Sequence, residues 1–175
     1  SAAQFLEFNI MRASTQEEFV RRVEDVIERL PKGEWIVGRF WGAYDQWAAG
    51  SAGNQRREAF GPDMNRVNDI TADYPMFIRK FDDSQFAANQ AALRALKLDL
   101  NNPQAPEVEF LRDSQGRLNG HMRGKGVTRL FNTVIPRNFS RERRMQQTIW
   151  ALGEIRKYGV TNISDMSDDL QLDLY

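Results

Sequence analysis

The sequence predicts an α+β fold, with a mainly antiparallel sheet and helices on one face of it. Apolar residues repeat with the period of a helix in some segments and alternate as in a strand in others. The turn sequence at 113–116 (DSQG) separates two strand-like segments, which is typical of an antiparallel hairpin. Predicted strands and helices follow one another in a mixed order, and the predicted hairpin disfavours a purely parallel sheet.

The composition is that of one globular domain without a general affinity for nucleic acid. The chain has 175 residues, of which 41% are hydrophobic and 27% charged, and its formal net charge is zero. We therefore expect no nucleic-acid partner and, without a long apolar stretch or a signal sequence, no membrane segment. The sequence does not indicate the cellular compartment of the protein. Basic residues cluster after 136 and favour a solvated helix face over a phosphate site; they are Arg137, Arg141, Arg143 and Arg144.

Histidine and cysteine are almost absent, which restricts the chemistry. The chain has one histidine, His121, and no cysteine. Zinc sites draw mainly on these two residue types, and a catalytic triad built on histidine could form only around His121. A single histidine in a hairpin strand favours a structural residue over a ligand or base.

The first half of the chain is predicted to hold three strands and two helices. Strands are expected at 4–10, 35–40 and 76–81, the last of them central, and a short helix at 62–70. Ser14 and Glu17 form a capping box for a helix that ends before Pro31. Residues 41–60 form a long loop of the kind that often carries function. The apolar stripe of the first helix is Phe19, Val20, Val23, Val26, Ile27 and Leu30.

The second half is predicted to hold a hairpin between helices. Helices are expected at 86–96, 127–135 and 140–158, with strands at 107–112, 117–122 and 160–166. Ser84 can cap the first of these helices and Ser140 the last. The inward stripe of the last helix is Met145, Ile149, Leu152 and Ile155.

Two groups of residues have both a structural and a functional interpretation. Asp82 and Asp83, next to Ser84, can cap a helix at the surface, or bind a cation or orient a substrate. Trp41 and Trp47, with Tyr44, can stack on a ligand or fill a core beneath the long loop.

Four segments in a fixed order carry a resemblance to a known family. They are 33–38 (GEWIVG) with 41–47 (WGAYDQW); 60–63 (FGPD) with 74–78 (YPMFI), 81–84 (FDDS) and 88–93 (ANQAAL); 111–113 (LRD) with Gly116 and Gly120; and 152–153 (LG) with 159–166 (GVTNISDM). Together they resemble the amidohydrolase family that includes N-substituted formamide deformylases and exoenzyme regulatory proteins.

The resemblance implies how the chain is organised. Members of the family hold a divalent metal, typically zinc, in a (β/α)₈ barrel, with a His-x-His pair before the matched region and further ligands after it. Residues 1–175 would then be a single roll-like insert domain between the first and second barrel strands, with 159–166 a returning barrel strand. The expected partners are that barrel, in the same polypeptide, and a small-molecule substrate. Self-association through an exposed patch that would face the barrel is also expected.

The resemblance also implies which residues face the active site of the full-length protein, whereas it implies no catalytic residue and no metal ligand in this chain. Many members have histidine where this chain has Ser84. The expected substrate-facing residues are Trp41, Asp45, Trp47, Asp82, Ser84 and Asn89, although an Asn early in a helix often only bonds to the backbone.

Three functions are compatible with these observations. The first is a non-catalytic part of a metal-dependent amidohydrolase that acts on C–N bonds, shaping or covering the substrate pocket. The second is a small-molecule-binding or regulatory module without hydrolase activity. The third is a metal-free enzyme that uses Asp82 or Asp83 as its base.

Overall fold

The computed structural model describes residues 10, 13–42, 60–136, 145, 148–149, 152–153 and 155–162. The chain divides into two compact units, one formed by Phe8–Pro136 and the other by Ser1–Glu7 with Arg137–Tyr175. The predicted strand at 4–10 and most of the loop at 41–60 lie outside the described residues.

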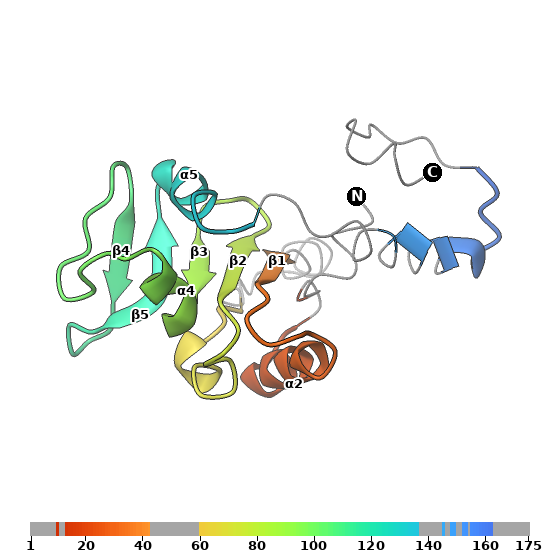
Figure 1. The fold of residues 1–175 in the computed structure, drawn as a ribbon, viewed down its shortest axis with the longest axis horizontal. Helices are drawn as coiled ribbons and strands as arrows, with labels where there is room; N and C mark the ends of the chain where they lie inside the picture. The colour runs from red at the N-terminus through yellow and green to blue at the C-terminus, as the bar shows by residue number, and fades with distance from the viewer. Residues whose placement is uncertain are drawn as a thin grey trace, which may run out of the picture. The chain divides into compact units, whose positions relative to one another are not determined.

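The first unit is built on a five-stranded mixed sheet, shown in Figure 1. Its strands are β1 (Ile36–Trp41), β2 (Met76–Lys80), β3 (Phe86–Ala88), β4 (Glu109–Arg112) and β5 (Leu118–Arg123). They lie in the order β1-β2-β3-β5-β4. The β1–β2 pair is parallel and the other three pairs are antiparallel. The α+β class and the mainly antiparallel sheet are therefore confirmed.

Helices cover both faces of this sheet, so the prediction that they lie on one face was wrong. The helices among the described residues of this unit are α2 (Gln16–Ile27), the 3₁₀ helix η1 (Met64–Arg66), α4 (Gln90–Ala95) and α5 (Gly126–Phe131). Met76 and Ile78 of β2 pack in one core cluster with residues of α2 and η1, whereas Phe77 packs in a second cluster with residues of α4 and α5. The physical reason lies in β2, which is apolar at consecutive positions and so needs cover on both sides.

The helix predicted at 86–96 is in fact a strand followed by a shorter helix. Residues 86–88 form β3, which pairs with β2 on one side and β5 on the other. The side chain of Asn89 then caps α4 by accepting a hydrogen bond from the N–H of Ala92 at 2.9 Å. Ser84 was therefore wrongly predicted as the cap. Local propensity for a helix at Phe86, Ala87 and Ala88 is overridden because these side chains are fully buried in the sheet.

Other predicted elements need smaller corrections. The apolar stripe of α2 packs as predicted, but its cap is one residue later, because Thr15 Oγ1 accepts from the N–H of Glu18 at 3.2 Å. The Glu18 carboxylate accepts from the N–H of Ser14, the residue before the cap, at 3.3 Å, so the reciprocal bond resembles a capping box shifted by one residue. The helix expected at 62–70 is only the single turn η1, and the one at 127–135 ends at Phe131.

The second unit is described only at 145, 148–149, 152–153 and 155–162. The described residues between 145 and 156 are helical, in agreement with the long helix predicted at 140–158. The predicted cap, Ser140, lies outside the described residues. Of the predicted stripe, Ile149 is 63% and Leu152 41% exposed, whereas Met145 and Ile155 are half-buried. Among all the described residues, no helix is long and apolar enough to cross a membrane.

Candidate functional site

The turn between β2 and β3 carries two of the predicted substrate-facing residues, Asp82 and Ser84. The turn is closed by a hydrogen bond from Lys80 N–H to the carbonyl of Gln85 at 2.9 Å. Asp83 adopts a left-handed backbone conformation with φ 53°, and Arg79 forms an ion pair with its carboxylate. The turn is thus a fixed structure that presents short polar side chains at one end of the sheet.

The carboxylate of Asp82 organises this turn. Its Oδ1 accepts hydrogen bonds from the Ser84 hydroxyl at 2.7 Å and the Ser84 N–H at 3.0 Å, and Lys80 Nζ lies 3.4 Å from Oδ2. Partial burial by itself would raise the pKa of Asp82, but these bonds and the lysine charge together hold the pKa below its usual value. Asp82 is therefore ionised at neutral pH, but its lowered pKa and its engaged oxygens make it a weak general base.

Trp41 lies next to this turn through its backbone, and its side chain lies in the core. The carbonyl of Trp41 accepts a hydrogen bond from Phe81 N–H at 3.2 Å. Its indole is 1% exposed and meets the ring of His121 edge to face, with ring centroids 6.2 Å apart. Of the two interpretations of this aromatic residue, the structure supports core packing.

Asn89 is a buried polar hub. Its Oδ1 accepts from the N–H groups of Ala92 and Met76, both at 2.9 Å. Its Nδ2 donates to Thr71 Oγ1 and to the carbonyl of Tyr74, both at 2.8 Å. With 1% exposure, Asn89 ties α4, β2 and the segment before β2 together. The backbone-bonding interpretation of this asparagine is therefore the one that its geometry supports.

His121 is a satisfied structural residue, as its position in a hairpin strand suggested. Its Nε2 lies 2.8 Å from the carbonyl of Pro62, and its Nδ1 lies 3.2 Å from the side-chain nitrogen of Gln85. These partners fit the neutral ring that donates from Nε2 and accepts at Nδ1. Burial lowers the pKa of His121, and the bond to Pro62 offsets part of this effect.

The predicted site residues do not converge on one surface. Asp82 and Ser84 share a turn that contacts the Trp41 backbone, whereas the side chains of Trp41 and Asn89 are buried. Asp45 and Trp47 lie outside the described residues. Their contact with substrate therefore stays a prediction.

The described residues do not fit a divalent metal. Within these ranges, no three residues of the types His, Cys, Asp and Glu lie together as a ligand group. Both nitrogens of His121 and both oxygens of Asp82 are already engaged by protein groups. A metal at either residue would have to displace those contacts.

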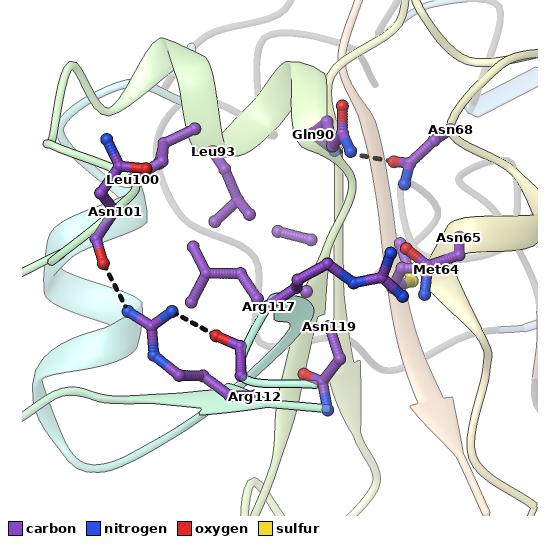
Figure 2. Close-up of a pocket in the computed structure, with 14 residues that line it drawn as sticks. Met64, Asn65, Asn68, Gln90, Leu93, Leu100, Asn101, Arg112, Arg117 and Asn119 are labelled. Atoms are coloured by element: carbon purple, nitrogen blue, oxygen red, sulfur yellow. Dashed lines mark hydrogen bonds between the residues drawn. The ribbon is translucent and has the colours of Figure 1, made fainter. Parts of the chain in front are cut away.

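A pocket that the sequence did not predict opens beside the β4–β5 hairpin, as Figure 2 shows. Its volume is about 400 Å³, and it is lined by residues of η1, β3, α4, β4 and β5 and of the segments between them. The signal in the sequence was weak, because its polar residues are spread over five segments between 64 and 120. The side chains with polar groups are Asn65, Asn68, Gln90, Asn101, Arg112, Arg117 and Asn119.

Comparison with known proteins identifies the family. The fold is similar to that in the crystal structure of an uncharacterized metal-dependent hydrolase from Pyrococcus horikoshii OT3, with a TM-score of 0.57 and 20% identity. The match covers 99% of this chain and 30% of the hydrolase, so the chain spans about a third of that protein's length. None of the curated proteins compared with the chain matches it.

The model of the amidohydrolase family matches residues 1–174. The chain therefore belongs to the amidohydrolase family, which confirms the resemblance seen in the sequence.

Proposed function

We propose that this chain is a non-catalytic part of a metal-dependent amidohydrolase that hydrolyses C–N bonds. The observation that carries the proposal is the family match over 1–174 combined with a solved hydrolase of which the chain spans 30%. The only histidine in the chain has both ring nitrogens bonded to protein groups. The metal, for which we expect zinc, would be held by residues of the barrel.

In this proposal the β2–β3 turn shapes or covers the substrate pocket of the full-length enzyme. The turn is held by Asp82, Ser84 and Lys80, so it can present a fixed polar edge without rearranging when substrate arrives. Asp45 and Trp47 would also contact the substrate. A fixed edge of this kind contributes to substrate binding and leaves the chemical step to the metal site.

The exposed apolar residues of the second unit support a partner surface. Ile149, Leu152 and Val160 are 63%, 41% and 44% exposed, and Tyr158 is 84% exposed. Large apolar side chains are costly to leave in water. We propose that the barrel covers them, with 159–166 as its returning strand, and that the isolated chain self-associates through them.

The test compares two aspartates with the same structural task in the full-length enzyme. Asp113 closes the β4–β5 turn as Asp82 closes the β2–β3 turn, and it accepts from the N–H groups of Gln115 and Arg117, both at 2.9 Å. We expect Asp82→Asn to raise KM about threefold or more with kcat nearly unchanged, and Asp113→Asn to change neither. Equal effects of the two variants, or an effect of Asp82→Asn on kcat alone, would contradict the proposal.

The alternative of a binding module without hydrolase activity is favoured by one observation, the pocket beside the β4–β5 hairpin. An active, metal-loaded full-length enzyme would exclude it as the whole function. It would leave open a binding role for that pocket alongside hydrolysis.

A further inference from the structure

The pocket beside the β4–β5 hairpin, called the hairpin pocket below, has a rigid floor and wall. Gly120 forms part of the floor with φ +84°, and a Cβ at this position would lie 2.5 Å from the carbonyl oxygen of Ala88. The guanidinium of Arg112 donates to the carbonyls of Gly116 at 2.7 Å and Asn101 at 2.8 Å, which joins the hairpin turn to the loop after α4 (Figure 2). The hollow is therefore built into the fold, with a volume of about 400 Å³, within the usual range for small-molecule sites.

The charge of the hairpin pocket is positive. Arg112 and Arg117 are the charged residues among those that line it, and both carry guanidinium groups. The Arg112 bonds go to neutral carbonyls, so its charge is not compensated there. Arg117 Nε lies 3.0 Å from the carboxylate of Asp113. Two guanidinium groups against one carboxylate leave one net positive charge at the pocket.

Two asparagines add hydrogen-bond donors. The Oδ1 of Asn119 accepts from the backbone N–H of His121, and the Oδ1 of Asn68 accepts from the backbone N–H of Gln90, both at 2.9 Å. A backbone N–H can only donate, so in each asparagine the oxygen must face it. The NH₂ group is then the part of each side chain that remains for a ligand.

Leucine side chains supply an apolar part of the pocket lining. Leu93 of α4 is buried, and Leu100 and Leu118 are half-buried against the same core cluster. In the view of Figure 2, Leu93 points from α4 into the pocket, and Arg117 extends toward Asn65 and Met64. An apolar wall beside clustered donors matches a ligand with an acyl chain and an anionic head.

We propose that the hairpin pocket binds a small monocarboxylate with an apolar chain. Guanidinium and amide N–H groups bind carboxylate oxygens with charge-assisted hydrogen bonds. One net positive charge balances a carboxylate, whereas a phosphate monoester carries close to two negative charges at neutral pH. The inference concerns residues that the proposed hydrolase role does not use, and either can fail without the other.

The test measures binding of hexanoate to the 175-residue chain by isothermal titration calorimetry, with acetate, hexanamide and hexyl phosphate as companion ligands. We expect saturable binding of hexanoate with a Kd of about 1 mM, and affinities at least about tenfold weaker for the other three. Acetate lacks the apolar chain, so it tests the contribution of the leucines. Hexanamide lacks the negative charge, so it tests the contribution of the guanidinium groups. Hexyl phosphate carries more negative charge than hexanoate, so it tests whether the ligand charge must match the single net positive charge of the pocket.

Arg117→Gln and Arg129→Gln form a matched pair of variants. Arg117 is 72% exposed and pairs with Asp113, and Arg129 of α5 is 66% exposed and pairs with Glu107, each at 3.0 Å. We expect Arg117→Gln to weaken hexanoate binding about tenfold and Arg129→Gln to leave it unchanged. Absence of saturable hexanoate binding, equal effects of the two variants, or hexyl phosphate binding as tightly as hexanoate would overturn the proposal.

Discussion

Replacing Asn89 by alanine should be among the most destabilising single changes in the first unit. The side chain is 1% exposed, and its amide bonds to four partners besides Thr71 Oγ1: the N–H groups of Ala92 and Met76 and the carbonyls of Tyr74 and Thr71. Loss of the cap on α4 costs about 1 kcal/mol. The buried N–H of Met76 and the partly buried carbonyl of Tyr74 each lose a partner, at about 1–3 kcal/mol for each. We expect Asn89→Ala to lower the free energy of unfolding by about 3–7 kcal/mol.

The matched control is Ser84→Ala, because the sequence predicted Ser84, and not Asn89, as the cap of this helix. Ser84 is exposed and bonds only within its own turn and to Lys80, so its loss should cost less than about 1 kcal/mol. Urea unfolding followed by circular dichroism measures both variants. Should Asn89→Ala prevent folding, Thr71→Val, which removes one partner of Asn89 and keeps the shape, should still fold with a loss of about 1–2 kcal/mol. A loss below about 1.5 kcal/mol for Asn89→Ala, or equal losses for Asn89→Ala and Ser84→Ala, would refute the reasoning.

Three further predictions concern other parts of the first unit. Thr15→Ala should cost about 1 kcal/mol and Ser14→Ala less than about 0.5, since Thr15 supplies the side-chain cap of α2; unfolding curves that rank them the other way would reject this capping geometry. Gly120→Ala and Gly116→Ala both place alanine at a positive φ, but only Gly120 has atoms within 4 Å of the added Cβ. Gly120→Ala should therefore lower the free energy of unfolding, measured in urea, by about 2 kcal/mol more than Gly116→Ala does. Equal losses for the two variants would argue against the close contact between residue 120 and the carbonyl of Ala88. Burial lowers the pKa of His121 in the folded state, so the unfolded state takes up the proton first and stability should fall as pH drops below about 6.5. The free energy of unfolding of His121→Gln, measured across the same pH range, should lack that part of the decline, and an unchanged pH profile would show that His121 is not its source.

Much of the fold was predictable because its signals are local. The apolar stripe of α2 and the turn sequence between β4 and β5 each depend on neighbours a few residues apart, and both were confirmed. The family was predictable from the order and spacing of short segments, which the family match confirms.

The errors arose where distant residues decide the outcome. Phe86, Ala87 and Ala88 suit a helix by local propensity, but pairing with β2 and β5 makes them a strand. That pairing moves the helix start to Asn89, whose bonds to Thr71 and Met76 no local pattern reveals. Helices on both faces have a different cause: the consecutive apolar residues Met76, Phe77 and Ile78 need cover on both sides of β2, and this local signal is absent from the one-face prediction.

The candidate site shows the same limit. The polar turn at Asp82 and Ser84 was visible as a motif, but only the structure shows that its carboxylate is engaged by Ser84 and Lys80. The hairpin pocket draws its polar residues from separate segments, and their meeting depends on β5 lying between β3 and β4.

The proposal that the metal of this hydrolase is held outside the 175-residue chain is tested most directly by counting bound metal. The chain and the full-length protein encoded by its gene would each be dialysed with zinc, and their metal content and amide hydrolysis measured together. We predict stoichiometric zinc and turnover for the full-length protein, and neither for the 175-residue chain. One tightly bound zinc per chain together with amide hydrolysis by the 175-residue chain would contradict the proposal.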